Sequence, residues 1–156
     1  MEDPNYYRGD LEYYREGEVE IIEFYYPTDS SWKCINCGNC CRDLDKRTRM
    51  ILLLPEDIKR IEETGADGFF EDWDEGSFIG IMCKEGGKCV FYSGEGCKIY
   101  EKRALLCRMY PFWLEKQGSY FVFGIDNECP GSGGKGKLDE EFFSNLLQMA
   151  LDAVNF

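Results

Sequence analysis

The chain has 156 residues, no histidine, and 30 acidic against 18 basic side chains, which gives a formal net charge of −12. This acidity argues against a nucleic-acid partner, because nucleic-acid binding depends on Lys and Arg that neutralise phosphates, and it equally disfavours an anionic membrane surface. The sequence has no apolar run as long as a membrane-spanning helix, and its acidic N-terminus is unlike the basic, then apolar, start of a signal peptide. We therefore expect a cytoplasmic protein with no membrane attachment.

The first half of the chain predicts a strand, a cysteine-rich loop and a helix, in that order. The opening 18 residues show no clear periodicity, whereas VEIIEFYY (19–26) is rich in β-forming residues and indicates a strand. A loop over 34–41 follows, because Gly and Asn there permit the tight backbone of a metal-binding turn. Helix signals cover 50–65, with Pro55 suited to the first turn and Gly65 to the end.

The second half alternates short strands and helices. GFFEDW (68–73) indicates a short helix, and SFIGIM and CVFY indicate strands separated by a turn at KEGGK. A helix within 97–113 stops at Pro111, and a hairpin over 110–125 turns near Gln117-Gly118. Residues 139–156 form an amphipathic helix whose apolar stripe we expect in the core. The prediction is a small α+β protein with one domain, residues 1–156.

Nine cysteines are the main chemical feature of this chain, and CINCGNCC (34–41) holds four of them in eight residues. An odd number of thiols in a reducing compartment does not fit a disulfide scaffold, and buried thiols placed by chance do not explain such a run. Thiolates select zinc or iron–sulfur clusters, with copper(I) as a third choice. Without histidine, the site is all-thiolate or includes oxygen ligands.

The spacing of the run favours iron–sulfur. Cys34, Cys37 and Cys40 have the C-x2-C-x2-C spacing by which bacterial ferredoxins present three cysteines to one cubane, and Cys129-Pro130 suits the remote fourth ligand. A zinc knuckle uses two C-x2-C pairs, and the downstream cysteines are not so paired. The adjacent Cys41 is expected to face away from Cys40, because an extended backbone sends successive side chains to opposite sides. Eight cysteines suffice for two four-thiolate centres, and their division stays open.

Three blocks of the sequence carry a resemblance: CINCGNCCR, GKCVFYSGEGCKIYEKRALLCRMYPF and ECPGSGGKG. They resemble the CxxCxxCC family, also called the YkgJ-type cysteine-cluster family, which is described as zinc- or iron-chelating, over a family-like core of about 32–137. The resemblance implies the metal ligands Cys34, Cys37, Cys40, Cys41, Cys89, Cys97, Cys107 and Cys129. Cys83 stands where an apolar residue is expected, so we interpret it as a buried thiol. The cluster is also similar to that of flagellin lysine methylases, which implies an iron–sulfur centre, but those proteins are larger.

Three arginines stand beside these cysteines in the sequence: Arg42, Arg103 and Arg108. Four thiolates around a divalent ion leave excess negative charge that is costly to bury, and guanidinium groups would offset it and tune a reduction potential. Ordinary surface arginines are the alternative. The apolar residues 110–113 are expected to form a lid over the site, although core packing gives the same pattern.

GSGGKGK (131–137) fits the phosphate-binding pattern GxxxxGK, but Leu138 stands where that pattern requires Ser or Thr. We expect instead a loop that turns the chain after Cys129 and starts the last helix.

Three classes of function remain. The first is a redox or accessory module whose iron–sulfur cluster, of 4Fe–4S type and either alone or one of two metal centres, exchanges electrons with an unidentified protein partner. The second is a structural zinc domain that serves protein interaction. The third is a cluster-dependent enzyme with an open iron, for example in methyl transfer, for which the sequence shows no catalytic residue.

Overall fold

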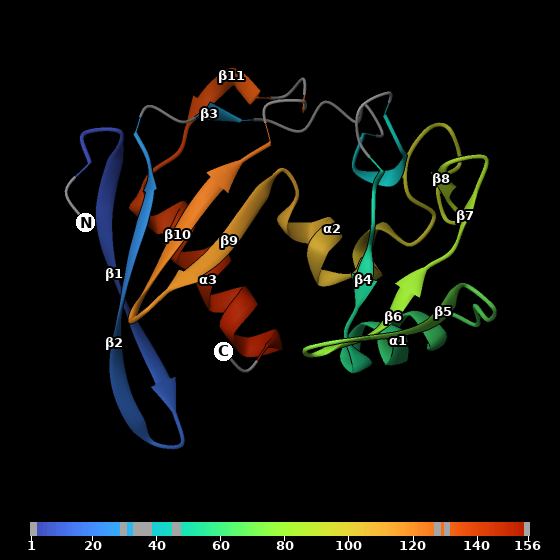
Figure 1. Cartoon of the computed structure of the whole chain (residues 1–156), viewed down its shortest axis with the longest axis horizontal. Coiled ribbons are helices and arrows are strands. Elements are labelled where there is room, and N and C mark those ends of the chain that lie inside the picture. Colours follow the sequence, from blue (N-terminus) through green and yellow to red (C-terminus); the bar gives the residue numbers. More distant parts are fainter. Residues whose placement is uncertain are drawn as a thin grey trace. The chain divides into compact units, whose positions relative to one another are not determined.

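The computed structural model describes residues 3–28, 31–32, 39–44, 48–126, 129 and 132–154, and the side chains among these except at 39 and 132–137. The chain forms two compact units. The first unit consists of residues 1–35 and 111–156, so it is built from both ends of the chain, and the second consists of residues 36–110. Figure 1 shows their elements.

A four-stranded sheet in the order β1-β2-β10-β9 forms the centre of the first unit. β1 (Tyr6–Arg15) and β2 (Glu18–Pro27) are joined by a two-residue turn at Glu16 and Gly17, both with positive φ, which matches the twist of a hairpin. The strand predicted over 19–26 is confirmed. β1 was not predicted, although the Glu-Gly pair between two tyrosine-rich runs is the signal that indicates it.

The second hairpin of this sheet is the one that the sequence predicts. β9 (Phe112–Gln117) and β10 (Tyr120–Ile125) pair antiparallel around Gly118, and β10 runs parallel to β2. A small antiparallel sheet pairs β11 (Ser132–Lys137) with β3 (Ser31–Trp32). The stretch that we expected as a glycine-rich loop is therefore mostly a strand, because its backbone pairs with a segment about 100 residues earlier, which no local pattern reports.

α3 (Glu140–Ala153) lies across one face of the four-stranded sheet (Figure 1). Its first turn is capped by the Asp139 carboxylate, which accepts a hydrogen bond from the backbone N–H of Phe142 at 2.9 Å. The predicted apolar stripe faces the core, where the Phe143 ring stacks on Tyr26 with ring centroids 5.0 Å apart. The Tyr13 hydroxyl donates to Asp152 at 3.0 Å and so ties β1 to the last helix.

In the second unit, α1 (Pro55–Glu62) begins at the predicted proline and ends shortly before Gly65, which has a positive φ. It packs beside a sheet of the order β4-β6-β5, formed by β4 (Leu52–Leu53), β6 (Phe78–Met82) and β5 (Phe70–Glu75). The helix predicted over 68–73 is wrong. That segment pairs with β6, and Phe69 is buried in the core of this unit, so tertiary pairing overrides the local pattern.

The remaining elements of this unit carry the cysteines. η1 (Asn39–Cys41) is a 3-10 turn, and β7 (Lys84–Glu85) and β8 (Lys88–Cys89) form a hairpin around Gly86-Gly87, both with positive φ. The turn at KEGGK is confirmed, but only Cys89 of the predicted strand CVFY is in β8. η2 (Tyr100–Lys102) precedes α2 (Leu105–Met109), which ends before Pro111 as predicted. None of the helices within the described ranges has the length and apolar character needed to cross a membrane.

Candidate metal centre

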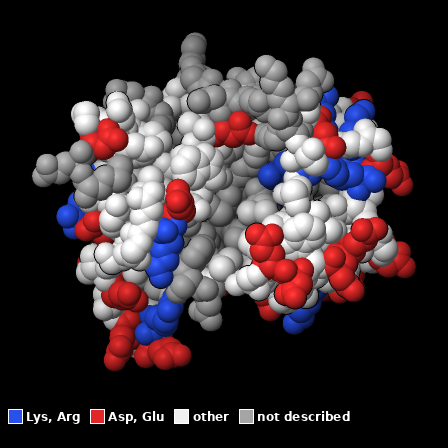
Figure 2. All heavy atoms as spheres, in the orientation of Figure 1, with Lys and Arg blue, Asp and Glu red and all other residues white. Residues whose placement is uncertain are grey.

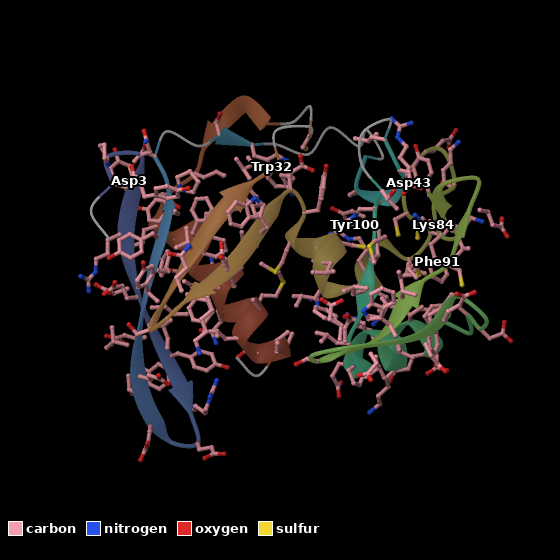
Figure 3. All side chains as sticks on the ribbon, viewed as in Figure 1. Asp3, Trp32, Asp43, Lys84, Phe91 and Tyr100 are labelled. Carbon is pink, nitrogen blue, oxygen red and sulfur yellow. The ribbon has the colours of Figure 1, made fainter. Side chains whose placement is uncertain are left out.

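Five thiols from separate parts of the second unit come together. Cys41, Cys89 and Cys107 are buried in one core cluster, and Cys40 packs against it. Cys97 pairs with Tyr92, which packs against the same cluster, so Cys97 lies at its edge. In Figure 3 several sulfur atoms lie near the labelled residues Tyr100 and Lys84. The fold thus collects thiols from η1, β8, the turn after Tyr92 and α2.

Cys40 and Cys41 face the same way, with their Sγ atoms 3.7 Å apart. The expectation that they face different ways is therefore wrong. The reason is the local backbone: in the 3-10 turn η1, successive side chains are rotated by about 120°, whereas an extended backbone rotates them by about 180°. Two thiolates on one tetrahedral ion, each about 2.3 Å from the metal, lie about 3.8 Å apart, so this pair fits a shared metal ion.

The protonation of these thiols is uneven. The hydrogen bond from Cys41 lowers the pKa of Cys40 to about 6, against the effect of burial, and the nearby arginines Arg49 and Arg103 assist. The same hydrogen bond, followed by burial, raises the pKa of Cys41. Burial raises the pKa of Cys107 to about 12, and also raises those of Cys89 and Cys97. Cys40 is therefore the preferred thiolate, and a metal ion would have to displace protons from the others.

Arg49 is a cation bonded directly to the backbone of this group, and no sequence pattern predicted it. Its Nε–H donates to the carbonyl oxygen of Cys40 at 2.9 Å, and its Nη2–H to that of Leu106 at 3.4 Å. Its guanidinium carbon lies 5.1 Å from the ring centroid of Tyr110. No spacing rule identifies Arg49, because it lies eight residues beyond the cysteine run and acts on segments that only the fold brings to it.

The three arginines that were predicted to offset the thiolate charge have different surroundings. The charge of Arg103 acts on Cys40 and Cys97, and its guanidinium stacks 3.9 Å from the Tyr100 ring centroid. Arg42 forms a backbone bridge to Lys88, next to Cys89. Burial, and then the neighbouring Arg60, lower the pKa of Arg108, whose buried Nε has no hydrogen-bond partner within the described part of the chain.

A family comparison agrees with this collection of thiols. The model of the CxxCxxCC family, described as "Putative zinc- or iron-chelating domain", matches residues 33–130, well over half of the chain. The chain belongs to the CxxCxxCC family. An uncharacterized protein of the archaeon Methanocaldococcus jannaschii is 29% identical over 146 residues, which cover 84% of this chain and 74% of that protein. No solved structure matches the chain.

The other cysteines of this CxxCxxCC protein either are not described or have surroundings of their own. Cys34 and Cys37 fall outside the described residues. Cys129 is buried in the first unit, where the Trp32 Nε1–H donates to its Sγ at 3.4 Å. Cys83 directly precedes Lys84, the cross-strand partner of Cys89, and because successive residues of an extended backbone face opposite sides, we expect Cys83 to face away from Cys89.

The lid expected over 110–113 is divided between the units. Tyr110 contacts Arg49 in the second unit, whereas Phe112 packs against Phe142 and Phe143 in the first. Trp113 is 48% exposed.

Among the described side chains, no three Cys, Asp or Glu groups stand in positions that would hold a metal ion together. The donor chemistry nevertheless fits a thiophilic metal, since the five gathered groups are all sulfur and one pair already has the spacing of shared ligands. Among the described residues, those that could hold such a metal are Cys40, Cys41, Cys89, Cys97 and Cys107.

Proposed function

We propose that this CxxCxxCC protein binds an iron–sulfur cluster, most simply of the 4Fe–4S type, and works as a redox or accessory module for a protein partner that donates or accepts electrons. The observation that carries this proposal is the group of five thiols in the second unit. Four thiolates complete either one cubane or one tetrahedral zinc ion, so five thiols suffice for a metal centre of either kind and the preference for iron–sulfur rests on their spacing. The C-x2-C-x2-C spacing of Cys34, Cys37 and Cys40 adds support, because ferredoxins present cubane ligands in this way.

Structural zinc is the second candidate, and one observation favours it. The 3.7 Å between the sulfur atoms of Cys40 and Cys41 suits two ligands of one ion, whereas each iron of a cubane takes a single cysteine. In this case the metal would stabilise the second unit, and the protein would act by binding a partner.

The metal content of protein purified without oxygen tests the choice between these candidates. About four iron and four acid-labile sulfide per chain, with visible absorbance that is lost on reduction, would support one cubane, and about eight of each would support two. A colourless protein with one or two zinc ions would replace the iron–sulfur proposal with the zinc candidate. A chain without either metal would contradict both.

A matched pair of substitutions tests the ligand set. Cys97 and Cys83 are both half-buried thiols of the second unit, but only Cys97 belongs to the group of five. We expect Cys97→Ser to lower the bound metal per folded chain and Cys83→Ser to leave it unchanged, because the hydroxyl of serine is a poor ligand for thiophilic metals. Equal loss in both variants, or full retention in Cys97→Ser, would contradict this assignment.

A further inference from the structure

One side chain joins two of the segments that carry the gathered thiols. The Arg49 guanidinium donates to the peptide carbonyl of Cys40 and to that of Leu106, the residue before Cys107. These two carbonyls are 66 positions apart in the sequence, and the planar fork of a single arginine spans both. The distance between η1 and α2 is therefore set in part by the length and shape of this side chain.

A neighbouring carboxylate extends the connection to a third segment. The backbone N–H of Arg49 donates to Asp43 at 2.7 Å, and the same carboxylate accepts from Lys84 Nζ at 2.8 Å. Lys84 is the cross-strand partner of Cys89, and the Asp43 N–H donates to the carbonyl of Gly87 at 2.7 Å in the same hairpin. Arg49 and Asp43 together thus connect the segments of Cys40, Cys89 and Cys107.

The positive charge of Arg49 would also stabilise bound thiolates. Four thiolates on a divalent ion carry excess negative charge, and burying that charge without a cation is costly. Arg49 is permanently charged, half-buried, and close enough for its charge to act on Cys40, Cys89 and Cys107. It is held in place by hydrogen bonds to backbone groups and by the Tyr110 ring, none of which involves a thiol.

We propose that Arg49 is the positioning residue of the metal centre: its two-pronged hydrogen bonding fixes the segments of Cys40 and Cys107 relative to each other, and its charge offsets that of the bound thiolates. This inference rests on the proposed metal-binding function. The offset of thiolate charge, predicted for the arginines adjacent to cysteines, is thereby assigned to Arg49. The role of Arg49 depends on the shape of its guanidinium as well as on its charge.

The test compares Arg49→Gln, which removes the charge, with Arg49→Lys, which keeps the charge and loses the fork. Arg15→Gln is the control, since Arg15 is an exposed arginine of the first unit. Each protein is titrated with zinc(II) against a competing chelator and with cobalt(II), whose visible absorption reports the thiolate geometry. Thermal unfolding of the metal-free proteins measures folding separately.

We expect both Arg49 variants to bind zinc about 10- to 100-fold more weakly than wild type, as is usual when a group supporting a metal ligand is removed. Their cobalt spectra should be altered, and Arg15→Gln should match wild type. If both Arg49 variants keep the metal affinity and the cobalt spectrum of wild type, the inference is wrong. If Arg49→Lys alone keeps them, charge is sufficient and the claim that the guanidinium positions the two segments is wrong. If wild type itself binds neither ion and contains no iron, the metal-binding function fails. The inference would also be wrong if an Arg49 variant bound zinc more weakly only because its metal-free form was unfolded, while its cobalt spectrum stayed that of wild type.

Discussion

At the scale of single residues, the buried carboxylate of Asp57 organises the start of both helices in the second unit. It is 1% exposed and accepts from the backbone N–H of Leu54, at the beginning of α1, and from that of Leu105, the first residue of α2. The Arg60 guanidinium forms a 2.7 Å ion pair with the Asp57 carboxylate and donates a 2.9 Å hydrogen bond to the carbonyl of Arg103. Because Cys107 lies in α2, this carboxylate also helps to place a thiol of the proposed centre.

Replacing this carboxylate should destabilise the second unit strongly. Asp57→Ala leaves two buried N–H donors and the Arg60 guanidinium without their acceptor, and the loss of one partner of a buried pair costs about 3–5 kcal/mol. Denaturant unfolding followed by circular dichroism measures the change. Asp74→Ala, at an exposed position of β5, should leave the unfolding curve almost unmoved, and a similar loss in both variants would speak against this role.

At the scale of elements, two strands of the first unit place a glycine under an aromatic ring of the neighbouring strand. Gly9 of β1 is the register partner of Phe24 of β2, and a Cβ at Gly9 would lie 2.8 Å from two atoms of the Phe24 ring. Gly124 of β10 is paired in the same way with Trp113 of β9, whose ring covers it. These glycines leave room for rings that pack flat across the sheet.

The two positions differ in the freedom of the ring. Phe24 is fully buried and has no route to solvent, so Gly9→Ala should cost about 1–3 kcal/mol through overpacking. Trp113 is 48% exposed and is free to rotate outward, so Gly124→Ala should cost clearly less. Thermal unfolding of the two variants against wild type checks the order, and an equal or reversed order would contradict the explanation.

At the scale of the whole molecule, the two ends of the chain form the first unit, and the segment between them forms the unit that gathers the thiols. Acidic side chains cover the visible face of the second unit over α1 and β5 in Figure 2, in agreement with the net charge of −12. The thiol group differs from this surface, since Arg49 and Arg103 bring positive charge to it. The cations are thus placed where bound thiolates would need them.

Metal removal should therefore act on one unit. We expect a chelator to destabilise residues 36–110 and leave the sheet of the first unit largely intact, because a ligand stabilises the structure that binds it, by about 2.7 kcal/mol at a hundredfold excess over Kd. Hydrogen exchange before and after chelation, resolved along the chain, measures this. Unchanged exchange throughout, or equal loosening of both units, would contradict the expectation.

Features that depend on neighbouring residues were predictable from the amino-acid sequence. Pro55 and Gly65 bound α1, Gln117-Gly118 placed the β9-β10 hairpin, and the apolar period of α3 located its buried face. The cysteine pattern likewise predicted the family and a thiophilic metal, because ligand type and spacing are properties of the chain itself.

Which distant residues meet became clear from the fold. β5 and β11 became strands through pairing partners elsewhere in the chain, against the local signals at GFFEDW and GSGGKGK. Cys40 and Cys41 share a direction because a 3-10 turn replaces extended backbone, and Arg49 joins the backbone of Cys40 in η1 to that of Leu106 in α2, far along the chain. Local propensity fixes the conformation of a few consecutive residues, whereas a metal centre depends on side chains that converge from far apart, and their convergence is set by packing and hydrogen bonding across the fold.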